Sequence, residues 1–323
     1  MICMGGFELL VPYLDFRVDA HDSGSDTVSK KGSGYMKKFL FSFVLLVVGC
    51  TGTGVFGESS VWKVQKDKSV IYLGGTCHVL RDTDYPLPPE FDQAYKAADI
   101  IVFETDIGKL LDPATQQKML TQARYADGST LDQHLSVQTR SELSAYCESN
   151  NVSLNAFRQF KPVMLIMTMT VMELMRLGVT QQGPDLFFYR QASKDRKVTA
   201  GLETIDEQMD YLLSMADGNE DAFVIHSIRD MNSLNQQFDV LANAWRKGDA
   251  GKLSELMVAK LKTEMPMLYK KLITDRNVNW LPLIEAYLKT PQTEFIVVGV
   301  GHLVGPDGII ETLKKRGFKV DKL

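Results

Sequence analysis

The stretch Val70-Ile71-Tyr72-Leu73-Gly74-Gly75-Thr76-Cys77-His78 decides the fold, because a similar pattern returns near the end of the chain as Phe295-Ile296-Val297-Val298-Gly299-Val300-Gly301-His302. Both copies consist of an apolar run followed by Gly-x-x-His. Such a run of β-branched and aromatic residues predicts a strand buried on both faces, and a glycine at its end permits a sharp turn. Each histidine then follows a strand end, the edge at which open α/β sheets bind ligands.

One copy of Gly-x-x-His would be typical of a turn that holds a hydrogen-bonded histidine. Two copies after strand-like runs, in a chain with only 5 histidines, favour a functional site. We therefore expect His78 and His302 to face each other across one pocket.

The composition indicates an ordinary globular protein. Of the 323 residues, 45% are hydrophobic, which excludes a largely disordered chain. The formal net charge is −4. Because the chain offers no basic surface for phosphates, we exclude nucleic acid as a partner.

The amino terminus carries the pattern of an export signal. Residues 1–35 show no periodicity, and we interpret them as an over-extended start or a disordered segment. From Met36, two lysines precede the apolar run Phe39 to Val48, which is too short to span a bilayer. We assign residues 36–57 to a signal peptide and linker.

The end of this signal resembles a bacterial lipobox. In Val47-Val48-Gly49-Cys50, cleavage would expose Cys50 for acylation, and the protein would be periplasmic and anchored to a bacterial membrane by lipid. The alternative is cleavage near Val55-Phe56-Gly57, which would release a soluble periplasmic protein that begins at Glu58. Beyond Cys50 only Cys77 and Cys147 follow, so at most one disulfide forms and no cysteine-rich zinc site is available.

The first half of the sheet is predicted by residues 61–104. A hairpin turns at Lys66-Asp67-Lys68, a proline-rich stretch leads into a helix over residues 90–98, and residues 99–104 form a second buried strand. Strand, helix and strand make a βαβ unit with parallel strands. Parallel neighbours would place Glu104, at the end of the second strand, at the same sheet edge as His78.

Residues 112–288 are predominantly helical in pattern. The helix over residues 161–177 contains five methionines, which we assign to the core rather than to a ligand site. A short strand at residues 197–201 ends near Glu203, which repeats the placement of Glu104. Alternatively, Glu203 lies in the first turn of a helix, where the helix dipole alone favours an acid.

The end of the chain completes the predicted sheet. A cluster with an arginine and two amides, Asp275 to Trp280, interrupts a helical pattern; such clusters are commonly solvated helix starts. A strand at 295–300, a helix at 309–316 and a strand at 318–320 follow. We predict an α/β fold, with a central mixed, largely parallel sheet formed by the N- and C-terminal parts and a large helical insertion between them. Residues 58–323 contain no evident linker and are expected to form a single domain.

Together these motifs resemble the TraB/GumN family, whose animal relatives include the Tiki metalloproteases. The paired Gly-x-x-His motifs, Gly-Leu-Glu-Thr at 201–204 with Gln208, Arg-Asn-x-x-Trp at 276–280 and Gly-His-Leu-x-Gly at 301–305 carry the likeness. The family is similar in fold to the erythromycin-esterase and haem-binding ChaN-like group. Its Tiki branch is associated with divalent-metal-dependent peptide cleavage.

The resemblance implies a divalent metal, Mn²⁺, Co²⁺ or Zn²⁺, held by His78, Glu104 and His302. We assign Glu203 to general base or outer-sphere support, and Arg276, with Asn277 beside it, to binding a carboxylate or the developing oxyanion. The expected substrate is a peptide or another small molecule. The alternatives are a metal-free hydrolase with His78 as general base, and a non-catalytic lipoprotein that binds haem or another ligand.

Overall fold

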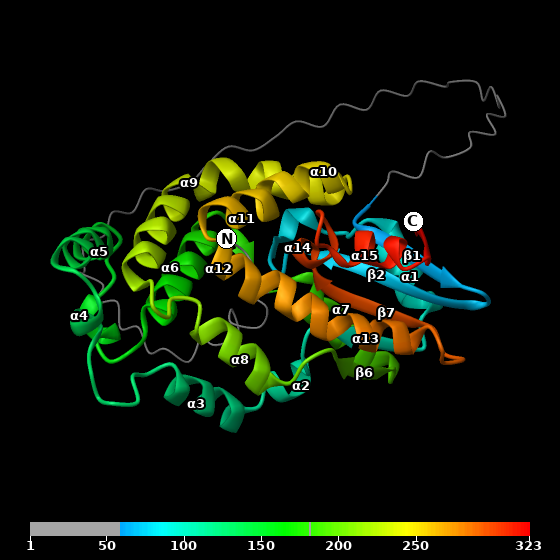
Figure 1. The fold of residues 1–323 in the computed structure, drawn as a ribbon, viewed down its shortest axis with the longest axis horizontal. Helices are drawn as coiled ribbons and strands as arrows, with labels where there is room; N and C mark the ends of the chain where they lie inside the picture. Colours follow the sequence, from blue (N-terminus) through cyan, green and yellow to red (C-terminus); the bar gives the residue numbers. More distant parts are fainter. Residues whose placement is uncertain (1–58, 181) are drawn as a thin grey trace, which may run out of the picture. The chain divides into compact units, whose positions relative to one another are not determined.

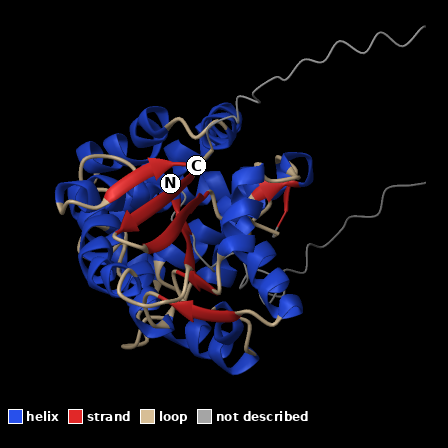
Figure 2. Ribbon diagram, turned by 90° about the vertical axis from the view of Figure 1, so that its right-hand side faces the viewer, coloured by secondary structure: helices blue, strands red, loops and turns tan. Residues whose placement is uncertain are grey.

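A six-stranded sheet forms the centre of the protein (Figures 1 and 2). The computed structural model describes residues 59–180 and 182–323. The strands of this sheet lie in the order β6-β4-β7-β2-β1-β8. They comprise β1 (Val61–Lys66), β2 (Ser69–Thr76), β4 (Ile100–Phe103), β6 (Val198–Gly201), β7 (Glu294–Gly299) and β8 (Lys319–Lys322), and a separate small pair joins β3 (Leu80–Arg81) to β5 (Val179–Thr180).

The parallel half of the sheet brings together strands from both ends of the sequence. Strand β7 pairs in parallel with β2 on one side and with β4 on the other, and β6 adds to β4, also in parallel. The predicted shared edge is therefore present. The prediction that β2 and β4 are direct neighbours is wrong, because β7 lies between them and pairs with both.

Helices lie on both faces of the sheet (Figure 2). The first group is α1 (Pro89–Ala97), α2 (Ile107–Leu110), α3 (Pro113–Gln122), α4 (Leu131–His134), α5 (Val137–Ser149), α6 (Pro162–Arg176) and α7 (Pro184–Asp195). The second is α8 (Ile205–Leu213), α9 (Glu220–Arg246), α10 (Ala250–Leu253), α11 (Lys260–Glu264), α12 (Pro266–Tyr269), α13 (Arg276–Tyr287), α14 (Val300–Leu303) and α15 (Ile309–Lys315). Short 3₁₀ turns are η3 (Asp82–Asp84) and η4 (Leu154–Phe157).

Two segments of π-helix, η5 (Ser254–Ala259) and η6 (Lys270–Asp275), interrupt the last long helices. Segment η6 runs directly into α13, so Arg276 follows a π-helical turn rather than starting a solvated helix. The cluster interpreted as a solvated helix start is therefore buried, and the apolar spacing is broken because this face contacts a polar site instead of aliphatic core.

Most other predicted elements are confirmed. Asp112 caps α3 through the Thr115 amide, and the methionine-rich α6 is buried among the helices. Among the described helices none has the length and hydrophobicity to cross a membrane. Cys77 and Cys147 are free and buried, and burial raises the pKa of both thiols. The expected signal segment and Cys50 lie outside the described residues.

Gly74 of β2 is matched to an aromatic side chain of β7. A Cβ at Gly74 would lie only 2.6 Å from Cε2 of Phe295, whose ring is fully buried and contacts Phe188 with ring centroids 5.4 Å apart. Gly74, the residue before the first Gly-x-x-His motif, therefore serves sheet packing.

We expect Gly74→Ala to lower the free energy of unfolding by about 1–3 kcal/mol, because the added methyl overpacks a closed core. Phe295→Leu in the same chain should recover part of this loss, since the two sites share one volume. Chemical denaturation of the single and double variants measures both effects. Gly251→Ala, whose Cβ would approach only Asp249 Oδ1 at 3.5 Å, is the matched control. Additive losses in the double variant would contradict the proposed contact.

Candidate active site

His78 lies at the carboxyl edge of the sheet, just after β2, and is 2% exposed. Its Nε2 is 3.5 Å from Oε1 of Glu104, and its Nδ1 is 3.3 Å from Oδ2 of Asp185. Asp185 is held in turn by the hydroxyl of Thr76, which donates a hydrogen bond of 3.0 Å. The imidazole is thus positioned between two carboxylates.

Two glycines make room for this histidine. His78 adopts a left-handed backbone conformation with φ of 57°, which is uncommon for residues other than glycine. A Cβ at Gly299 would lie 2.6 Å from His78 Nε2, and one at Gly183 would lie 1.5 Å from the His78 carbonyl oxygen. Gly299, the first residue of the second Gly-x-x-His motif, therefore has to be a glycine because His78 of the first motif occupies the space beside it.

Glu104 follows β4 and accepts hydrogen bonds on both oxygens. The Gly299 amide donates to Oε1 at 2.8 Å, and Arg276 and Gln208 donate to Oε2 at 2.6 and 3.4 Å. Burial alone would raise the pKa of Glu104. The Arg276 guanidinium, the two imidazoles and the Gly299 amide outweigh it and hold that pKa well below its usual range. Glu104 is therefore a carboxylate at neutral pH.

His302 lies in the one-turn helix α14, directly after β7, and is fully buried. Asn277 donates through Nδ2 to the carbonyls of His302 and Asp307, which leaves its Oδ1 to accept from His302 Nδ1 at 2.8 Å. With the proton on Nδ1, Nε2 of His302 is an acceptor, and Arg276 Nη1 donates to it at 3.1 Å. Burial, followed by the nearby Arg276 charge, lowers the pKa of His302 to about 3, so the ring is neutral.

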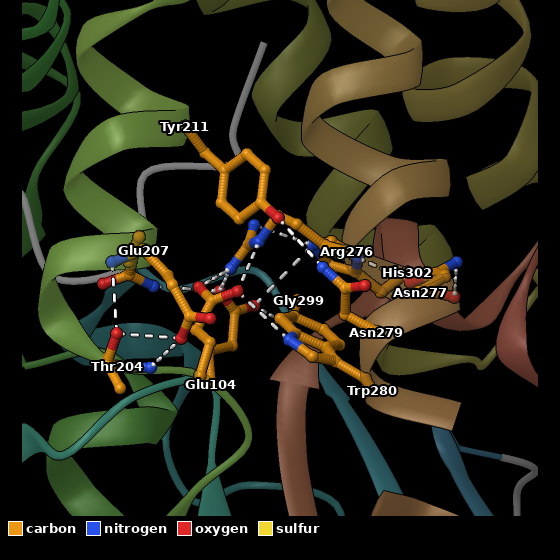
Figure 3. A network of polar contacts seen from close by, with 12 residues as sticks. Glu104, Thr204, Glu207, Tyr211, Arg276, Asn277, Asn279, Trp280, Gly299 and His302 are labelled. Carbon is orange, nitrogen blue, oxygen red and sulfur yellow. Dashed lines mark hydrogen bonds and ion pairs between the residues drawn. The ribbon is translucent and has the colours of Figure 1, made fainter. Parts of the chain in front are cut away.

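Arg276 connects these groups to Glu203. It donates through Nε and Nη2 to the two Glu203 oxygens at 3.1 and 2.6 Å, while the same Nη2 donates to Glu104 (Figure 3). The indole of Trp280 donates to Glu203 Oε2 at 3.1 Å and lies under the guanidinium. Burial raises the pKa of Glu203 against the opposing effect of Arg276. Burial alone would lower the pKa of Arg276, but Glu104 and Glu203 together raise it.

Glu203 is not in the first turn of a helix, because α8 begins at Ile205 with Thr204 as its N-cap. It lies in the loop after β6, where its amide donates to the Glu104 carbonyl. This loop forms part of a polar groove of about 720 Å³. The groove is also lined by lysine and acidic side chains of α2, α3 and α8 and by Tyr211 and Asn279, and Asn279 donates a hydrogen bond to the Tyr211 hydroxyl (Figure 3).

Two separations in the donor set are compatible with a shared divalent ion, and one hydrogen bond would have to open. Two ligand atoms on a common ion lie about 3.4 Å apart in tetrahedral geometry and at most about 4.2 Å apart. His78 Nε2 and His302 Nε2 lie 3.5 and 4.0 Å from Glu104 Oε1, within that limit. In the described part of the chain, no three His, Cys, Asp or Glu side chains already form a ready-made cation site. Here Arg276 donates to His302 Nε2, and that hydrogen bond would have to open.

The structure brings together all six side chains that the sequence analysis singled out in this region; their roles stay predictions. They are His78, Glu104, Glu203, Arg276, Asn277 and His302. Sequence reasoning missed Asp185, which lies in the first turn of α7, directly after Pro184. The only signal was an acid at a helix start, which is common for other reasons.

The comparisons with known proteins agree with the resemblance stated above. The model of the TraB/PrgY/gumN family matches residues 60–322. No curated protein and no solved structure matches the chain. The Tiki-like detail therefore rests on the motifs alone.

The neutral, buried His302 predicts a pH dependence of stability. Between pH 6.5 and about 3 the unfolded chain binds a proton at this ring and the folded chain does not, so acidification favours unfolding. The stability is fully present above pH 6.5 and falls by roughly 1.4 kcal/mol per pH unit below it. Denaturation of the wild type and of His302→Gln between pH 7 and 4 measures the difference. Parallel curves for the two proteins would show that His302 does not titrate in this way.

Proposed function

The chain belongs to the TraB/PrgY/gumN family, and on that premise we propose that it is a hydrolase of peptide-like substrates that uses a divalent metal ion. One observation carries the proposal. Each imidazole presents Nδ1 to a fixed oxygen, Asp185 Oδ2 or Asn277 Oδ1, and turns Nε2 toward the same Glu104 oxygen. Histidines that bind metals are characteristically held in this way through their other ring nitrogen.

In this proposal His78, Glu104 and His302 would hold the ion, which would be Mn²⁺, Co²⁺ or Zn²⁺. A bound divalent ion supplies a Lewis acid that polarises a carbonyl and makes a water more acidic. Asp185 and Asn277 keep both imidazoles in the tautomer that offers Nε2. Among the described residues, the carboxylates Glu104, Glu203 and Asp185 outnumber the cation Arg276 that contacts them, so the pocket attracts positive charge.

Glu203 is suited to moving the proton of the attacking water. Its pKa is raised toward neutral pH, which favours general base catalysis. Oε2 accepts from both Arg276 and Trp280, whereas Oε1 accepts from Arg276 alone and retains a lone pair for a proton. Arg276 would orient Glu203 and, once released from His302, stabilise negative charge on the substrate oxygen.

The groove beside Glu203 supports a polar substrate with charges of both signs. Its charged lining residues have both signs with an excess of acids: Lys109 and Lys118, and Asp106, Glu203, Asp206 and Glu207. Leu283 and Pro282 add an apolar wall. Such a surface is better matched to a peptide than to a polyanion.

A metal-free hydrolase is the second candidate, and Arg276 is the observation that favours it. The guanidinium already neutralises Glu104 and binds His302, while His78 lies between Glu104 and Asp185 in the arrangement of an oriented general base. In this case His78 would take the proton of the attacking water and His302 would hold Arg276.

Export remains part of the proposal and is supported by the sequence alone. We propose that the chain is directed to the periplasm by the segment from Met36 and anchored by a lipid on Cys50. A periplasmic location would give the groove access to exported or cell-wall peptides.

The two candidates differ in a double-mutant cycle of the histidines. If one ion needs both rings, His78→Ala should abolish most binding of Mn²⁺, Co²⁺ or Zn²⁺, and adding His302→Ala should then cost far less, because ligands of one ion act as a unit. Calorimetric metal titration measures affinity, and cleavage of unfolded casein with and without metal measures activity.

His134→Ala, a histidine in α4, is the control for unspecific metal binding. Activity that persists after chelation and is lost in His78→Ala would support the metal-free mechanism instead. Additive losses of melting temperature with no metal binding and no cleavage in any variant would leave the histidines as fold elements and end the hydrolase proposal.

The lipid anchor is tested separately. Cys50→Ser should move the protein from the membrane fraction to the soluble periplasm, because no other acylation site is proposed. Fractionation followed by mass spectrometry of the mature amino terminus measures this. A wild-type protein that is soluble and begins at Glu58 would show that the alternative cleavage site is used.

A further inference from the structure

A second cavity reaches Gly301, the residue before His302, and shares no lining residue with the polar groove. It has a volume of about 100 Å³ and is lined by apolar side chains of α6, α9, α11 and α12 and of the two π-helical segments. Four of its lining residues are methionines, Met167, Met215, Met257 and Met265. Methionine side chains are flexible and polarisable, and proteins use them where an apolar surface must adapt to a ligand.

The cavity shares its walls with the candidate active site. Ile273, in η6 three residues before Arg276, and Gly301, directly before His302, both line it. Segments η5 and η6 each pack against α14, which carries both Gly301 and His302. π-Helical turns are rare and frequently mark functional sites, because they can revert to α-helix with a shift of register. A ligand in this cavity would therefore contact the elements that position Arg276 and His302.

Polar groups at the cavity already contact one another. Lys260 forms an ion pair of 2.7 Å with Asp230, and Glu264 lies 3.5 Å from His226 Nδ1. Both Asp230 and His226 belong to the lining, and their side chains are only a quarter exposed. Because Asp230 and Glu264 already contact Lys260 and His226, a charged ligand would find no unengaged counter-charge among these groups and would lose hydration without compensation.

We propose that this cavity is a binding site for an uncharged, short aliphatic chain with a hydrogen-bonding head, and that its occupancy is transmitted to Arg276 and His302. The volume sets the size: it is smaller than the ~150 Å³ apolar cavity that holds benzene in an engineered protein. The aliphatic body lies among the methionines. The head lies at the mouth, beside Ser227 and His226.

The experiment uses straight-chain alcohols as probes and the full chain labelled with ¹³C at its methionine methyl groups and with ¹⁵N in its arginine side chains. Titration with 1-butanol and 1-pentanol should shift the four lining methionine signals and leave those of Met119 and Met231, which lie outside the cavity, unmoved. Affinity should rise roughly fourfold for the added methylene until the cavity is full. The Arg276 Nε–H signal should move with the same titration curve.

Two variants, Gly301→Ala and Ser227→Leu, each reduce the volume of the cavity. In Gly301→Ala the new Cβ would lie 3.8 Å from both Ile273 Cδ1 and Met257 Cε, ordinary contacts that occupy space without a clash. Ser227→Leu narrows the mouth and keeps the test valid if Gly301→Ala fails to fold. Each should weaken 1-pentanol binding by roughly fourfold or more, whereas Gly251→Ala should not.

Two outcomes overturn the proposal. Methionine signals that do not respond, or that respond equally in the narrowed variants, would show that the cavity is a packing void. Binding that leaves the Arg276 signal unmoved would remove the link to the candidate active site. Neither outcome depends on catalysis, so a failure of the hydrolase proposal is distinguishable from a failure of this one.

Discussion

The site depends on one buried guanidinium. Arg276 is 2% exposed and contacts two carboxylates, an imidazole and an indole, which come from four separate parts of the chain. Taking an arginine and two acids out of water costs several kcal/mol per ion, and only full pairing offsets that cost. Removing Arg276 would leave two buried carboxylates without a compensating charge. Arg276 therefore fixes the position of α13 relative to the sheet edge and to the loop after β6.

The topology explains why the two histidine motifs are repeated and yet differ. Strands β2 and β7 are parallel neighbours, with Thr76 opposite Gly299, so both motifs leave the sheet at the same level. The first chain segment turns through a left-handed residue and the second through a one-turn helix. These different exits let the two rings approach one Glu104 oxygen from two sides. A symmetrical repeat would have placed the imidazoles side by side along the strands.

Sequence reasoning predicted the sheet edge and its histidines because these follow from local rules. Uninterrupted apolar runs indicate buried parallel strands, and parallel strands end at one edge. It did not predict that β7 separates β2 from β4, since strand order depends on which strand edges pair in three dimensions. Nor could it identify Asp185 or the π-helical turns. The first is defined by a contact with a residue more than a hundred positions away, and the second by a register that side-chain spacing alone does not reveal.

Arg276 and the proposed ion would compete for one carboxylate, that of Glu104. Glu104 offers Oε2 to Arg276 and Oε1 to the histidines, and Oε1 already accepts the Gly299 amide. A cation entering between the rings would be repelled by a guanidinium bound to two of its three ligands, and no cysteine thiolate is available there to outweigh this repulsion. Metal binding at this site would thus be moderate in affinity, exchangeable with solution and coupled to movement of Arg276. The same movement would free a positive group for the substrate, so that loading of the ion and preparation of the oxyanion site would be one event.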